Sequence, residues 1–165
     1  MFKQTAALAI LGVSLLTGGC SDSENRVTPT GPVGLRAGGS TSSITMQPSV
    51  VATQVIGRGT CPQVQPLRAL LNLNVLADDF ELRLREIRLQ FFDTIGMAAP
   101  QVTLPAPVLT AQFGTALVQA RSARSFPLDF FFGCGTGRRG TIVVIVQTED
   151  GRGKNHFSEM RVQVQ

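Results

Sequence analysis

The densest group of ionisable side chains lies between residues 149 and 156, where the sequence reads EDGRGKNH. It contains Glu149, Asp150, Arg152, Lys154 and His156. Carboxylates beside a histidine can carry out acid–base chemistry or hold a cation, and loops often carry recognition. The Asp-Gly pair at 150–151 is equally typical of a solvated hairpin turn. We therefore treat these five residues as a candidate binding loop, with a plain turn as the alternative.

His156 is the single histidine of the chain and so the natural focus of any catalytic hypothesis. A catalytic histidine needs an orienting partner and a sheltered position. His156 instead follows a glycine-rich basic stretch, GRGKN, so we expect it to be open to water and dispensable for folding. We also expect no metal site, because nothing here matches the paired C-x-x-C spacing of structural zinc.

The segment from Gly135 to Gly140 spells G-x-G-x-x-G, the lettering of a dinucleotide-binding loop. Such a loop must open a helix whose N-terminus receives the pyrophosphate. The residues that follow, TIVVIVQT, are β-branched at nearly every step and predict a strand. We read the segment as a glycine-rich turn and expect no cofactor. No hydrolase elbow, zinc-protease, Walker or EF-hand motif is present either.

The N-terminus has the pattern of an export signal. One positive charge, Lys3, precedes an apolar run over 6–16 and the small residues TGG, and Cys20 follows directly. The apolar run is too short to span a bilayer, which takes about 20 residues. The segment resembles bacterial lipoprotein signals, although Thr17 stands where those signals usually have an aliphatic residue. The resemblance implies cleavage after residue 19 and lipidation of Cys20; an ordinary secretory signal cut after Gly19 is the alternative.

The cysteine count agrees with this interpretation. Three cysteines are present, Cys20, Cys61 and Cys134, and an odd number in an exported protein requires a separate fate for one of them. Lipidation of Cys20 leaves an even pair. In an oxidising compartment Cys61 and Cys134 are then candidates for a disulfide bond.

Residues 20–42 predict a lipidated N-terminus and a disordered tether, because they are rich in Ser, Thr, Gly and Pro and poor in large apolar groups. The formal net charge of the whole chain is only +4, without a dense basic run, so we expect no nucleic-acid partner.

From residue 43 to the C-terminus the apolar residues recur with a period of two, which indicates half-buried strands. The stretch over 141–148 is apolar on both faces, as for a central strand packed on both sides. Cys134 is in phase with the inward positions of the strand before it. We expect strands in these ranges: about 43–56, 67–77, 81–92, a region of two strands over 100–132, 141–149 and 157–164.

The segment 80–93, FELRLREIRLQFFD, allows two interpretations. Phe80, Leu84, Ile87 and Phe91 fall at helical spacing. A strand requires the inward parity to shift between Leu84 and Ile87, which a β-bulge near Arg85-Glu86 would supply. We favour the bulged strand because its neighbours on both sides also predict strands.

Short strands separated by recurrent turn signals, with no clear helix, are typical of a β-sandwich. The last two strands and the loop between them, TIVVIVQTEDGRGKNHFSEMRVQV, resemble the closing strands of immunoglobulin-like and fibronectin-like domains of bacterial envelope proteins. The chain lacks the Trp and Tyr that mark many such domains. The resemblance implies an all-β immunoglobulin-like sandwich of about seven strands over 43–165, with the loops that hold Cys61 and Cys134 at the same end.

Together these features predict a cell-envelope lipoprotein held to the membrane by its lipid anchor, with the outer membrane favoured where one exists. The folded part would lie in the periplasm or at the cell surface as a noncatalytic module, structural or binding an envelope protein or a glycan. The alternative is a small exported hydrolase or metal-dependent enzyme that uses the region around His156.

Overall fold

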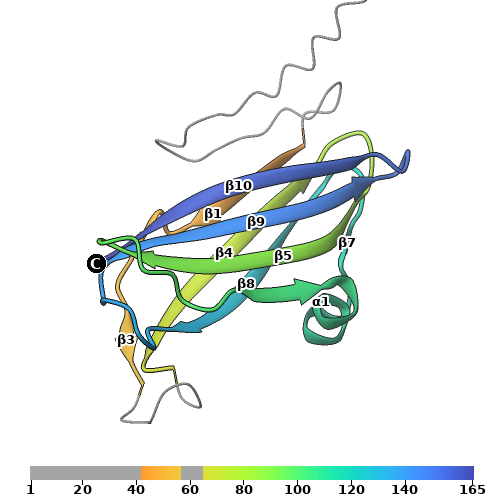
Figure 1. Ribbon diagram of the computed structural model, residues 1–165. Coiled ribbons are helices and arrows are strands. Elements are labelled where there is room, and N and C mark those ends of the chain that lie inside the picture. The colour runs from red at the N-terminus through yellow and green to blue at the C-terminus, as the bar shows by residue number, and fades with distance from the viewer. Residues whose placement is uncertain (1–41, 57–64) are drawn as a thin grey trace, which may run out of the picture.

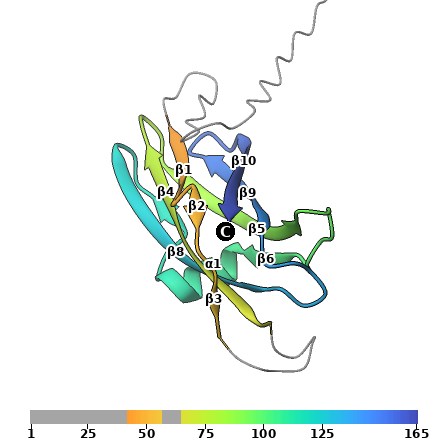
Figure 2. The same ribbon diagram turned by 90° about the vertical axis from the view of Figure 1, so that its left-hand side faces the viewer.

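The computed structural model describes residues 42–56 and 65–165. The signal segment, Cys20, the tether up to residue 41 and Cys61 lie outside the described residues, so the predictions made for them stay predictions. Figures 1 and 2 show a two-layer β-sandwich, with β4 and β8 in one layer and β5, β9 and β10 in the other.

The smaller sheet is built around one long strand. That strand, β4, pairs antiparallel with β8 along its whole length and with the short β1 and β3 on its other side. Along β4, buried inward side chains alternate with outward ones that are half-buried or exposed, as the sequence pattern predicts. The strands are β1 (Ser43–Gln47), β3 (Gln54–Val55), β4 (Leu67–Ala77) and β8 (Ser122–Phe132).

The larger sheet has the order β2-β10-β9-β5-β6, with β7 also paired to β5. β9 is central, between β5 and β10, and both pairings are antiparallel. The strands are β2 (Val50–Val51), β5 (Leu82–Asp93), β6 (Val102–Pro105), β7 (Leu117–Val118), β9 (Gly140–Asp150) and β10 (Asn155–Val164).

The first predicted strand, about 43–56, is three short strands. β1 pairs with β4 in the smaller sheet, β2 pairs parallel with the end of β10 in the larger sheet, and β3 returns to β4. The chain thus crosses twice between the layers along one side of the sandwich. This crossing leaves most of the β10 edge without β2.

Inward-facing side chains of the two sheets form one continuous hydrophobic core. Its centre is aromatic: the Phe91 and Phe132 rings lie 4.4 Å apart, and Phe130 stacks on Phe132 at 5.2 Å. Each fully buried side chain of this size contributes roughly 1.5–3 kcal/mol through burial, so this cluster is a main source of stability.

The sequence prediction missed one helix, α1 (Ala106–Phe113), inside the region expected to hold only strands. In the sequence, the Pro105-Ala106-Pro107 stretch is typical of a turn. Proline is also favoured in the first turn of a helix, where its missing N–H costs nothing. Only Leu109 of this helix is buried, so the sequence carries little helical periodicity. Phe113 packs edge-on against Phe126 and attaches the helix to the core.

The predicted fold class, an all-β sandwich, is confirmed. The bulge in β5 is confirmed as well: its register against β9 shifts between Leu84 and Glu86. Within the part of the chain that the structure describes, no helix has the length and hydropathy required to cross a membrane.

Candidate functional site

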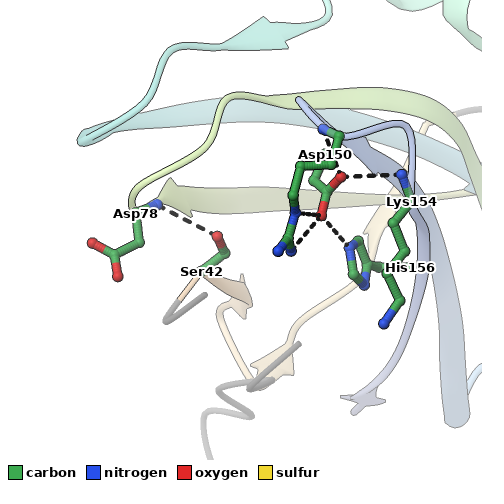
Figure 3. A network of polar contacts seen from close by, with 6 residues as sticks. Ser42, Asp78, Asp150, Lys154 and His156 are labelled. Carbon is green, nitrogen blue, oxygen red and sulfur yellow. Dashed lines mark hydrogen bonds and ion pairs between the residues drawn. The ribbon is translucent and has the colours of Figure 1, made fainter. Parts of the chain in front are cut away.

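Asp150 is the centre of the polar network at the β9–β10 hairpin (Figure 3). Its Oδ1 accepts hydrogen bonds from the backbone N–H groups of Arg152, at 2.9 Å, and Lys154, at 3.0 Å. Its Oδ2 accepts from the Arg152 guanidinium, at 2.9 and 3.3 Å, and lies 3.2 Å from Nε2 of His156. The carboxylate therefore fixes the turn and contacts the side chains of two other residues of the predicted binding loop, Arg152 and His156.

This arrangement keeps Asp150 ionised. Burial alone would raise the pKa of its carboxyl group, but the Lys154 backbone N–H, the Arg152 guanidinium and His156 together hold that pKa far below its usual range. Because an ionised carboxylate can only accept hydrogen bonds, the facing Nε2 of His156 is the nitrogen that carries a proton.

The expectation that His156 is open to water is wrong. Its side chain is only 14% exposed and contacts an Asp150 side chain that is 1% exposed. The physical reason is strand parity: β10 begins at Asn155, two residues earlier than predicted, so His156 belongs to the strand. It shares the inward side of β10 with Ser158 and Met160, both buried.

His156 also lines a cavity of about 240 Å³ beside the start of β1, which we call the edge pocket. Its wall combines hydroxyl groups with aliphatic and aromatic carbon. The lining residues are Ser42, Ile44, Leu82, Thr148, Asn155, His156, Phe157 and Ser158. In residues 42–56 and 65–165 no three His, Cys, Asp or Glu side chains lie together as a metal site would require.

The predicted binding loop divides between two faces of the sheet. Asp150, Arg152 and His156 interact on one side, and Lys154 joins them through its backbone N–H. Glu149 forms an ion pair with Arg85 instead, and Arg85 Nε lies 2.8 Å from its Oε2. Arg152 also lies over the Phe80 ring, 4.4 Å from its centroid. Most of the charged side chains that suggested ligand binding thus contact other residues of the same chain.

A second hollow, which the sequence analysis did not identify, lies on the outer face of the larger sheet; we call it the outer groove. Its volume is about 480 Å³, and it runs across β5, β9 and β10. Gln90 donates to the Ala99 carbonyl at 3.2 Å, which holds the loop after β5 against one wall. The lining residues are Arg88, Gln90, Phe92, Gln101, Thr141, Val143, Ile145, Glu159 and Arg161.

The floor of the outer groove is β9, the strand predicted to be packed on both faces. Its inward residues are buried, as expected, but Thr141, Val143 and Ile145 on the outer face are only half-buried and no described element covers them. The prediction is therefore half wrong. The apolar outward residues of β9 were the sequence signal for this surface.

Paired charges stand on both sides of that apolar floor. Arg88 forms an ion pair with Glu86 on β5, and Arg161 with Glu159 at 3.0 Å on β10. In the sheet register, Ile145 stands between Arg88 and Glu159, and Val143 between Gln90 and Arg161. The groove thus places positively charged donors and negatively charged acceptors one strand away from the apolar side chains of β9.

The Gly135–Gly140 segment connects β8 to β9, with a strand after it, as predicted. Gly140 is required for packing, because a Cβ there would lie 2.0 Å from the Phe92 carbonyl oxygen. Gly137 donates its N–H to Asp93 at 2.9 Å. These glycines serve a tight connection at the end of the sheet, which agrees with the turn predicted there.

Cys134 begins this connection, and its backbone N–H donates to the Gln65 side chain at 3.0 Å. Gln65 follows the Cys61 loop by a few residues and directly precedes Pro66 and β4. Gln65 and Cys134 therefore lie at the same end of the sandwich. The Cys61–Cys134 bridge itself remains a prediction, since Cys61 is outside the described residues.

No protein-family model matches the sequence, and no curated protein matches it. Among solved structures, a target of the Northeast Structural Genomics Consortium aligns with a TM-score of 0.50 and 10% identity, over 74% of this chain and 84% of that chain. A putative ApaA protein of Bordetella pertussis gives 0.46 at 9% identity, over 74% and 92%. A Niemann-Pick type C2 protein of the Japanese carpenter ant gives 0.35 at 7%, over 70% and 93%. At 10% identity, the similarity to the first of these extends to the β-rich fold alone.

Proposed function

We propose that this protein is a lipid-anchored module of a bacterial cell envelope that binds a glycan, without catalysis, in the outer groove. The observation that carries the proposal is the half-buried apolar floor of Val143 and Ile145 between rows of polar side chains. Surfaces that combine apolar carbon with a few convergent polar groups are typical of ligand sites.

The chemistry of the lining favours a glycan over a protein partner. Sugar rings present hydroxyl groups at their rims and apolar C–H faces. Arg88, Gln90 and Arg161 supply donors for the rims, Glu159 supplies an acceptor, and Phe92 and the β9 floor supply apolar contact. Because the charges of both signs are present in pairs, the surface suits a neutral or zwitterionic ligand better than a strongly charged one.

The location is proposed from the N-terminal sequence. The apolar run before Cys20, the odd cysteine count and the polar segment 20–42 support a lipidated, tethered domain in the periplasm or at the cell surface. Replacement Cys20→Ser should release the protein from the membrane fraction, because stable anchoring depends on the acyl chains. Unchanged membrane retention, or a mature N-terminus other than Cys20, would contradict the anchor.

Glycan binding is tested by co-sedimentation of the purified domain with insoluble peptidoglycan. The variants Val143→Asp and Arg161→Ala should each weaken retention by about tenfold, as expected when a well-packed or charged contact is lost. Arg138→Ala is the matched control, since Arg138 is an exposed arginine outside the groove. Equal retention of wild type and both groove variants, or no retention of any of them, would contradict the proposal.

A hydrolase is the second candidate, and one observation favours it: Asp150 orients His156 beside the edge pocket, which also holds Ser158. A serine hydrolase needs a hydroxyl bonded to the other ring nitrogen. No such bond is present among the described residues, and Asp150 is also occupied by Arg152. Turnover of a p-nitrophenyl ester that disappears in His156→Ala would favour this candidate; equal rates in both would exclude it.

A further inference from the structure

The outer edge of β10 is divided into a paired part and an open part. At its C-terminal end, the N–H groups of Gln163 and Gln165 donate to Ser49 and Val51, at 2.9 and 3.1 Å. From Asn155 to Arg161, no described strand pairs with this edge, because β2 contains only two residues. Among the described residues, the larger sheet therefore ends along this stretch in the main-chain N–H and C=O groups of β10.

The direction of these groups follows from the register. Main-chain N–H and C=O groups of an antiparallel strand point alternately toward one neighbour and the other. Gln163 and Gln165 point away from β9, toward β2, and the β9–β10 register continues without a bulge. The main-chain groups of Phe157, Glu159 and Arg161 therefore also point away from β9, along the open edge.

The edge pocket lies beside this open stretch, on the inner side of the sheet. Ile44 and Leu82 give it aliphatic walls, and Asn155, Phe157 and Ser158 of β10 border it. At about 240 Å³ the pocket is smaller than the sites of drug-sized ligands, which start near 300 Å³, and its size suits one large side chain.

We propose that the open edge of β10 binds an extended segment of a partner protein by β-strand addition, with one apolar side chain of that segment in the edge pocket. In this mode the main chain supplies the hydrogen bonds, and alternate side chains enter pockets. The β2 strand, which already pairs with the last residues of β10, shows that this edge accepts a parallel neighbour.

The outward side chains of β10 define the other half of the partner segment. Phe157, Glu159 and Arg161 stand on the outer face, and Phe157 is 64% exposed. Cross-strand pairs favour aromatic or β-branched residues opposite Phe157, a basic residue opposite Glu159 and an acidic residue opposite Arg161. In the expected segment, every second residue is apolar and faces the sandwich. The residues between them face outward and are, in order, apolar, basic and acidic.

Among the described strands, the other long unpaired edge, that of β8, is protected, which distinguishes β10. β8 pairs only with β4 among the described strands, but Pro127 in its middle has no N–H to donate. Proline and charged pairs are common protections of edge strands. Asp129, two residues on, is held by a bidentate contact from Arg68 at 2.8 and 2.9 Å. β10 has no proline between Asn155 and Val164.

The test uses the mature chain and a synthetic eight-residue peptide in which leucine occupies every second position. Valine, lysine and glutamate, in that order, occupy the positions between the leucines. A peptide of the same composition in scrambled order is the control. We expect the ordered peptide to bind at least about tenfold more tightly and to shift the amide NMR signals of residues 155–161. Equal binding of both peptides, or shifts on β8 in place of β10, would overturn the proposal.

Two variants separate the main-chain contact from the pocket. Phe157→Pro removes an N–H that points away from β9 and should weaken binding by about tenfold, whereas Phe157→Thr keeps that N–H and should bind nearly as wild type. Ser158→Leu, which fills the pocket, should weaken binding independently and keeps the proposal testable if the proline variant does not fold. Unchanged binding in folded Phe157→Pro or Ser158→Leu would overturn it. Neither variant changes a residue that lines the outer groove, so the two binding proposals can fail separately.

Discussion

Two buried aspartates hold opposite ends of the larger sheet, and they do so with different partners. Asp93 ends β5 beside Gly140, the first residue of β9, and Asp150 ends β9 beside Leu82, the first residue of β5. Among the described residues, the Asp93 side chain accepts from backbone N–H groups only: Ile95 at 3.0 Å, Met97 at 2.8 Å and Gly137 at 2.9 Å. Asp150 accepts backbone groups as well, but also an arginine and a histidine.

The difference indicates that Asp93 has a structural role, whereas Asp150 belongs to a group of side chains that could take part in binding or chemistry. Hydrogen bonds from the backbone N–H groups of Gly137, Met97 and Ile95 lower the pKa of Asp93, although burial alone would raise it. None of these backbone donors is ionisable. At the Asp150 end, the partners are themselves ionisable and one of them lines a pocket. Functional change through polar substitutions is therefore to be expected at the Asp150 end, and only loss of stability at the Asp93 end.

The largest expected difference in stability between the two ends comes from a covalent bond. The predicted Cys61–Cys134 disulfide would close the Asp93 end, and a bridge over a loop of this length contributes about 4 kcal/mol. We expect Cys134→Ser to lower the free energy of unfolding by about that amount. Non-reducing mass spectrometry of protein taken from the envelope should find the two cysteine peptides linked. Free thiols at both positions would contradict the bridge.

Gly140→Ala should damage the Asp93 end next most strongly. Its new Cβ would lie 2.0 Å from the Phe92 carbonyl oxygen and 2.7 Å from Cα of Asp93, so the backbone must move. We expect a loss of about 3 kcal/mol in urea unfolding. Gly137→Ala is the matched control, because its Cβ would have its nearest neighbour at 3.5 Å and should change stability by no more than about 0.5 kcal/mol. Similar losses in both variants would show that close approach at Gly140 is not the cause.

Asp150→Asn tests the opposite end. The amide cannot accept all five donors and places its own N–H₂ group among them, so we expect a loss of about 2 kcal/mol at pH 7. The pH dependence has a definite sign. Because the folded pKa of Asp150 is depressed, its contribution to stability is full above its ordinary pKa of about 3.9 and is lost as the pH falls below it. Wild type should lose more stability than Asp150→Asn between pH 5 and pH 2; parallel curves would contradict this assignment.

The sequence predicted the long strands well because burial on one face imposes a strict period of two. The range 67–77 agrees with β4 at both ends, and the bulge near Arg85 followed from the parity change between Leu84 and Ile87. What failed has tertiary causes. The division of 43–56 into three strands depends on which sheet each piece reaches, and α1 buries only Leu109, so neither carries a local pattern.

The candidate site was predicted in composition but not in orientation. Asp150, Arg152 and His156 do come together, yet β9 ends one residue later and β10 begins two residues earlier than predicted, and parity then turns His156 inward. The outer groove was missed because Val143 and Ile145 resemble core residues in the sequence. Whether such a face is covered depends on the rest of the fold.

His156→Ala gives the smallest expected effect and tests the corrected position of this residue. An exposed histidine would cost no more than about 0.5 kcal/mol to remove. In the structure, the ring is mostly buried and donates to Asp150, so its loss should cost about 1 kcal/mol in urea unfolding at pH 7, moderated because Arg152 still pairs with the carboxylate. His156→Gln, whose side-chain amide can still donate, is the matched control and should recover part of that loss.

If His156→Ala and Asp150→Asn are combined, the losses should not add, because both remove the same contact. Strict additivity would mean that His156 and Asp150 do not interact in solution, and the structural basis for the hydrolase candidate would disappear with that contact.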